Sequence, residues 1–160
     1  MLTINVICVG KIKEKFFAAA IEEYIKRIGR YANIRIIEVK DESTSNISSD
    51  TEIAKVLDCE GSRILDKVPN GSFTITLCIE GQQKSSEELS SKISQLSLDG
   101  ISCINFVIGG SLGLSELVKS RSDMKLSFSK LTFPHQLMRV ILLEQIYRAF
   151  CISNGTPYHK

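Results

Sequence analysis

Residues 104–135, INFVIGGSLGLSELVKSRSDMKLSFSKLTFPH, contain the pattern that decides the fold. An apolar, β-branched run at Ile104–Ile108 ends in the glycine-rich turn Gly109–Gly113, and a second short run follows at Lys125–Phe128. Beyond it, Pro134–Phe150 reads as a helix, because proline suits the first helical turn and apolar residues recur at helical spacing. Strands that alternate with helical segments predict a parallel sheet.

The same alternation fills the rest of the chain. Three further apolar runs are each followed by a stretch with helical spacing, and Ser85 and Glu88 stand at capping-box spacing. The predicted fold class is therefore α/β, with a mostly parallel sheet flanked by helices in a single domain, residues 1–160. The further strands are expected at Ile4–Val9, Ile34–Val39 and Phe73–Ile79, and the further helices at Lys11–Ile28, Asp50–Leu65 and Ser85–Leu98.

Composition bounds the class of protein. The chain has 160 residues, of which 43% are apolar, which suffices for one ordinary core. No apolar stretch reaches the ~18 residues of a membrane span, and the first residues lack the basic start and cleavage site of a signal peptide. We therefore expect a cytoplasmic protein without membrane contact.

The five cysteines do not indicate a metal site or a disulfide framework. They form an odd set with no Cys-x-x-Cys pair and no histidine at ligand spacing. Three of them lie in strand-like runs. Buried, reduced thiols are the expectation, with no metal bound.

Charge is distributed unevenly along the chain. The net charge is +2, but residues 1–40 carry 8 basic and 4 acidic side chains, residues 41–100 carry 5 and 11, and residues 101–160 carry 7 and 3. The three segments are thus +4, −6 and +4. A basic C-terminal third with both histidines is compatible with phosphate binding and also with a face that binds nothing.

Three strand exits carry unusual residues. They are Leu77–Gly81, Ile108–Gly113 and Ser127–His135. Ligands of open α/β sheets bind outside the carboxyl ends of the strands, so these segments are expected to line one crevice. The glycine loop is neither Gly-x-Gly-x-x-Gly nor a P-loop, which disfavours a dinucleotide or ATP site. Taken alone, the glycine loop is as consistent with a tight strand-to-helix turn as with a cofactor-binding loop.

The C-terminal third offers candidate catalytic groups. His135 and Arg139 are four residues apart and share one helix face, where they face an anion or form a solvated basic end. Tyr158, His159 and Lys160 suit an RNA substrate, since a ring stacks on an extruded base while cations hold phosphate, although chain ends are usually frayed. The lysines of Gly10–Lys15 could contact phosphate, but a solvated first helical turn is the simpler interpretation.

Several short motifs occur along the chain in an order and spacing that are typical of one protein family. Together they resemble the RlmH family, SPOUT-class ribosomal RNA large subunit methyltransferases that methylate N3 of a pseudouridine, and the resemblance covers essentially the whole chain. Its strength lies in order and spacing, because no single motif is specific. The motifs are Val9–Gly10–Lys11, Glu80–Gly81, Ile108–Gly109–Gly110 with Gly113, Leu126–Ser127, Phe133–Pro134–His135, Arg139, Glu144–Gln145, Tyr147–Arg148–Ala149 and Pro157–Tyr158–His159.

The resemblance implies properties that periodicity does not show. It implies a C-terminal trefoil knot, a homodimer, S-adenosyl-L-methionine as cofactor, no metal, and 23S ribosomal RNA within the assembled ribosome as substrate. True knots are otherwise very rare. Carried over by position, the cofactor-binding residues are Leu77, Gly109, Phe128, Ser129, Lys130, Leu131, Thr132 and Phe133.

Methyl transfer to N3 also requires loss of the N3 proton or stabilisation of the resulting anion. His135 and His159 are candidate bases, Arg139 is a candidate anion stabiliser, and Tyr158 is a candidate stacking partner. We further expect the tail to complete the partner subunit's site. Two other function classes stay open: a ribosome-binding factor that modifies nothing, and a non-enzymatic nucleotide-binding regulatory module.

Overall fold

The computed structural model describes all 160 residues and confirms an α/β fold built on one five-stranded sheet. Every strand pairing is parallel, and the strand order is β2-β1-β4-β3-β5. The strands are β1 (Thr3–Val9), β2 (Asn33–Val39), β3 (Phe73–Gln83), β4 (Cys103–Ile108) and β5 (Met124–Ser127), and the helices are α1 (Lys15–Ile28), α2 (Asp50–Leu65), α3 (Ser86–Leu98), α4 (Glu116–Arg121) and α5 (His135–Ser153).

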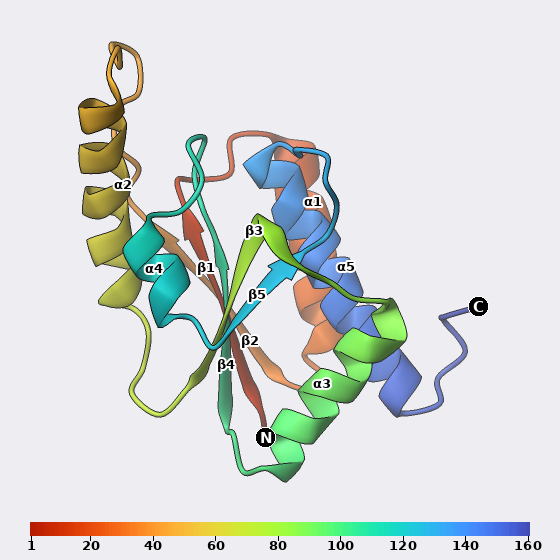
Figure 1. Ribbon diagram of the computed structural model, residues 1–160. Helices are drawn as coiled ribbons and strands as arrows, with labels where there is room; N and C mark the ends of the chain where they lie inside the picture. Colours follow the sequence, from red (N-terminus) through yellow and green to blue (C-terminus); the bar gives the residue numbers. More distant parts are fainter.

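Helices cover both faces of the sheet. Figure 1 shows α1, α3 and α5 on one side and α2 and α4 on the other. A large apolar core fills the first side, centred on Phe106 of β4 and Leu142 of α5. A smaller core under α2 and α4 contains Ile7, Ile64 and Val107. Helices on both faces are the reason why the central strands β1 and β4 read as nearly continuous apolar runs.

Local sequence signals account for most helix boundaries. At the start of α3 the Ser85 side chain accepts a hydrogen bond from the Glu88 N–H, and the Glu88 carboxylate accepts one from the Ser85 N–H. This reciprocal pair is the predicted capping box. α2 has the predicted bounds, whereas α1 begins at Lys15 rather than Lys11. Residues 11–14 form an irregular connection instead.

Strand β3 differs from the expectation, because it continues past Ile79 to Gln83. Its register with β5 shifts between Leu77 and Gln82, so β3 bulges where it passes the end of β5. A Cβ atom at Gly81 would stand 2.8 Å from the Leu126 backbone, which explains why a glycine occupies this crossing. The bulge places the segment between Leu77 and Gly81 at the carboxyl edge of the sheet.

The cysteine expectation is partly wrong. All five thiols are free, as expected, but only Cys8 and Cys151 are buried, while Cys78 and Cys103 are half-buried and Cys59 is exposed. Cys59 is exposed because it lies on the outer face of α2, where helical spacing does not force burial. None of the helices is long and apolar enough to cross a membrane.

Candidate functional site at the carboxyl edge of the sheet

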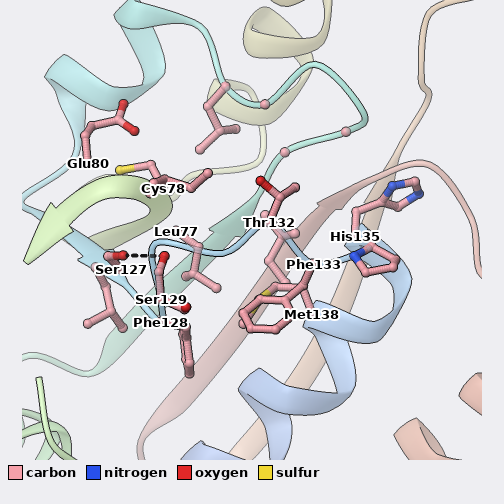
Figure 2. A pocket seen from close by; sticks show the side chains of 18 of the residues that line it. Leu77, Cys78, Glu80, Ser127, Phe128, Ser129, Thr132, Phe133, His135 and Met138 are labelled. Atoms are coloured by element: carbon pink, nitrogen blue, oxygen red, sulfur yellow. Dashed lines mark hydrogen bonds between the residues drawn. The ribbon is translucent and has the colours of Figure 1, made fainter. Parts of the chain in front are cut away.

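The predicted crevice is present as one pocket of about 770 Å³. The bulged part of β3, the segments that follow β4 and β5, and the first turn of α5 line it, and Figure 2 shows their side chains converging from these elements. Half of the lining residues are hydrophobic. Apolar walls with a few polar groups are typical of sites that bind small organic ligands.

The glycine loop after β4 forms one wall. Gly110 and Gly113 form an isolated bridge, and the Gly113 N–H donates to the Gly110 carbonyl over 3.0 Å. A Cβ atom at Gly109 would stand 2.4 Å from the Gly113 carbonyl oxygen, and Gly113 has φ +87°. The loop therefore folds onto itself so tightly that no larger residue fits at Gly109.

The loop after β5 forms the opposite wall. The Ser127 hydroxyl donates to the Ser129 carbonyl over 3.1 Å, and the Leu131 N–H donates to the Ser129 hydroxyl over 3.0 Å. Six of the eight residues expected to bind cofactor lie in this loop, and five of those six line the pocket. The exception is Lys130, which is exposed and outside the lining. Leu77 and Gly109, the other two, also line the pocket.

His135 stands at the mouth of the pocket as the first residue of α5. Partial burial lowers the pKa of this imidazole, and the nearby Arg139 guanidinium lowers it further. His135 is consequently neutral at physiological pH and retains a ring nitrogen that can accept a proton. Figure 2 shows the His135 ring at one side of the pocket, near Phe133 and Met138, which contribute to its apolar floor.

Arg139 does not lie in the pocket. Its side chain is 1% exposed and points toward the end of β1, where it donates to the Val9 carbonyl over 3.2 Å and to the Gly10 carbonyl over 2.7 Å. It also pairs with Glu38 of β2 over 2.9 Å. Both terminal nitrogens of the guanidinium therefore donate to protein oxygens, whereas the buried Nε–H has no hydrogen-bond partner. The role of Arg139 as an anion stabiliser stays a prediction.

The tail is docked rather than frayed. The Tyr158 hydroxyl donates to Glu144 over 3.0 Å and the ring packs edge-on against Tyr147, with ring centroids 4.8 Å apart. His159 bridges Glu87 on α3 and Arg148 on α5, at 2.8 and 3.2 Å. The ion pair between Glu144 and Arg148 thus anchors the tail. Neither Tyr158 nor His159 lines the pocket of its own subunit.

A charged pair in the pocket was missed by the sequence reasoning. Lys119 of α4 lines the pocket, pairs with Glu80 from the β3 exit and reaches Glu116 over 2.9 Å. Cys78 lies next to Glu80, and burial raises the pKa of its thiol. Lys119 was overlooked because α4 has only six residues, too few to show a helical period.

The fold and the pocket together define an α/β protein with a pocket of the size and chemistry of a small-ligand site at the carboxyl edge of a parallel sheet. No group of three or more His, Cys, Asp or Glu side chains forms a metal site. A family model described as "Predicted SPOUT methyltransferase" matches residues 2–159. The chain belongs to this SPOUT methyltransferase family, within the group of ribosomal RNA large subunit methyltransferase H proteins.

Curated relatives match over their full length. A protein from Methanococcus maripaludis is 58% identical, over 99% of this chain and 100% of its own length. Proteins from Oenococcus oeni, 52% identical over 100% of both chains, and from Bifidobacterium animalis subsp. lactis, 54% identical over 99% of this chain and 100% of its own, are named ribosomal RNA large subunit methyltransferase H.

A solved structure supports the fold alone. It is described as a probable methylase family protein from Haemophilus influenzae, and it superposes with a TM-score of 0.56 at 12% sequence identity. The match covers 98% of this chain and 70% of that one.

Proposed function

We propose that this protein is an S-adenosyl-L-methionine-dependent methyltransferase that methylates N3 of a pseudouridine in 23S ribosomal RNA of the assembled ribosome. The observation that carries the proposal is the pocket, since seven of the eight residues expected to bind the cofactor line it. Full-length relatives named ribosomal RNA large subunit methyltransferase H support the substrate class. The site of action would be the cytoplasm, where ribosomes are.

The pocket fits S-adenosyl-L-methionine in size and in chemistry. Its apolar floor suits a flat purine, and its volume of about 770 Å³ lies within the range of small-molecule sites. Serine and threonine hydroxyls and the Glu80–Lys119 pair supply polar partners for a ribose and for a zwitterionic amino acid. When bound, the cofactor supplies an electrophilic methyl group on a sulfonium.

Methyl transfer itself needs positioning more than acid–base chemistry, because the acceptor must align with the methyl group. The chain provides this with two loops fixed by internal hydrogen bonds, at Gly110–Gly113 and Ser127–Leu131. The N3 proton still has to be removed. His135 is neutral at the pocket mouth and is one candidate base, and His159 is the other.

The site is completed by a second subunit in this proposal. Along α5, Glu144, which holds Tyr158, lies nine residues beyond His135, or about 13 Å on a straight helix. The tail is therefore displaced from the pocket of its own subunit. The trefoil knot stays a prediction of the resemblance.

Nucleoside mass spectrometry of large-subunit RNA tests the proposal. A strain that lacks the protein should lack one methylpseudouridine, and the modification should return when the protein is re-expressed. Ribosomes incubated with the purified protein and methyl-labelled cofactor should acquire label in 23S RNA. Binding to ribosomes without transfer of label would instead identify a ribosome-binding factor, and titration that detects ATP but not S-adenosyl-L-methionine would identify a nucleotide-binding module.

Mixed dimers test the composite site. One protomer lacks Tyr158–Lys160 and the other carries Gly109→Asp in the cofactor loop. If the tail serves the partner's pocket, one of the two pockets in each heterodimer is intact, and activity returns on mixing. Heterodimers no more active than either parent would exclude a shared site.

A further inference from the structure

The connection between β1 and α1 and the first residue of α1 carry an unpaired basic cluster. Lys11, Lys13 and Lys15 are all exposed. None of them takes part in an ion pair or in a side-chain hydrogen bond, in contrast to Arg27, Arg63, Lys119, Arg139 and Arg148, which all have acidic partners. Three lysines within five residues and without partners are available for a polyanion.

Side chains of β2 and α5 make hydrogen bonds to the backbone of this connection. The Ile12 N–H donates to Glu38 over 3.2 Å, and the Lys13 N–H donates to the Gln136 side chain over 3.0 Å. Arg139 donates a hydrogen bond to the carbonyl of Gly10, which directly precedes the cluster. A backbone fixed at three successive points loses little conformational entropy when its lysines bind a ligand.

The anchoring residue also places the cluster beside the pocket. Gln136 directly follows His135, which lines the pocket mouth. Figure 1 shows the chain after β1 crossing over the start of α5 on its way to α1. The lysines are close enough for Lys13 to contribute to the lowered pKa of the His135 imidazole. The cluster thus borders the opening through which a base would reach the pocket.

Acidic side chains do not neutralise the cluster. Glu14 lies within it, and Asp41 approaches Gly10, with 3.9 Å between the Asp41 side chain and a Cβ placed on that glycine. Neither carboxylate pairs with a lysine, and Glu38 is already occupied by Arg139. The lysines are therefore in excess at this edge.

We infer that Lys11, Lys13 and Lys15 bind the RNA backbone next to the target nucleotide, so that phosphate contacts on the β1–α1 connection position the base at the pocket. This inference rests on the proposed function and adds to it the surface that receives the RNA. Phosphate contacts of this kind fix register without reading sequence.

The test is a triple variant, K11Q/K13Q/K15Q, compared with a control, K26Q/K55Q/K67Q, in which three exposed lysines without ion pairs are replaced elsewhere. Methylation of ribosomes is measured over a range of salt concentrations. We expect the KM for ribosomes to rise about tenfold or more in the first variant. The plot of log(kcat/KM) against log salt has a negative slope, and its magnitude should decrease by about 2 to 3 in the first variant. This decrease corresponds to the loss of roughly one phosphate contact per lysine.

Two further readouts separate the possible outcomes. Affinity for S-adenosyl-L-methionine, measured by titration, should be the same in both variants and in the wild type, and failure of the wild type to bind it would refute the proposed function instead. Equal KM values and salt slopes in the two variants would overturn the inference. Dissociation of K11Q/K13Q/K15Q into monomers in sedimentation experiments would also overturn it, because the cluster would then bind a second copy of the chain.

Discussion

Replacing Arg139 with methionine should destabilise the protein strongly, although the side chain makes only one ion pair. Methionine keeps a long apolar chain but removes the guanidinium. The Val9 and Gly10 carbonyls then lose a donor in a buried region, and Glu38 loses its partner. These groups lie more than 95 residues away in sequence, so the substitution cuts a link between α5 and the β1–β2 edge.

The size of the effect follows from burial. A buried group left without its hydrogen bond costs about 1–3 kcal/mol, and two carbonyls are affected here. Glu38 adds little, since its side chain is 38% exposed and water can solvate it. The loss is thus about 3 kcal/mol, and at about 2–4 °C per kcal/mol for a chain of this size it lowers Tm by about 6–12 °C.

Thermal unfolding followed by circular dichroism, at one fixed protein concentration, measures this shift. The matched control is Arg27→Met, which removes an arginine from the exposed pair with Glu23. The control should shift Tm far less, because Arg27 and Glu23 are both exposed to water. If Arg139→Met and Arg27→Met lower Tm equally, the buried contacts of Arg139 do not stabilise the fold as argued.

Three further predictions concern the site and its supports. The methylation rate, measured in single turnovers as a function of pH, should stay constant as the pH is lowered to the ordinary histidine pKa of about 6.5 and fall only below it. The reason is that burial and then Arg139 lower the pKa of His135. His135→Gln should remove this fall in rate at low pH. Gly109→Ala should weaken S-adenosyl-L-methionine binding at least tenfold by calorimetry, because its Cβ would meet the Gly113 carbonyl oxygen at 2.4 Å. Gly29→Ala, whose Cβ would come no closer than 3.3 Å to the Ile25 carbonyl oxygen and which lies outside the pocket, should leave binding unchanged. Ser85→Ala should cost about 1 kcal/mol and lower Tm by about 2–4 °C through loss of the α3 cap, with exposed Ser62→Ala as the neutral comparison.

The fold was largely predictable because burial on both faces of the sheet leaves a plain record in the sequence. β1 and β4 are covered on both sides and therefore read as apolar runs that only Asn5 and Asn105 interrupt. The extension of β3 could not be predicted from the sequence, because Gly81 has no side chain and Gln82 and Gln83 are polar. These residues belong to the strand only because they pair with β5 beyond the bulge. Pairing of this kind is a tertiary property.

The pocket was predictable from topology, whereas the directions of individual side chains were not. Parallel strands bring their carboxyl ends to one edge, so the exits at Leu77, Gly109 and Phe128 had to meet. Spacing of four residues correctly placed His135 and Arg139 near one another on α5. It could not show that Arg139 turns inward, because its partners come from β1 and β2.

The inward turn of Arg139 connects features that the sequence presents separately. The same guanidinium holds the Gly10 carbonyl at the base of the lysine cluster and pairs with Glu38, whose carboxylate also accepts the Ile12 N–H. One turn away, Gln136 holds the Lys13 backbone. The first turn of α5 therefore fixes both the wall of the pocket that ends in His135 and the edge proposed to receive RNA. Because the two share one support, a loosened α5 start should impair RNA positioning and pocket geometry together, whereas substitution of the exposed lysines should affect RNA positioning alone.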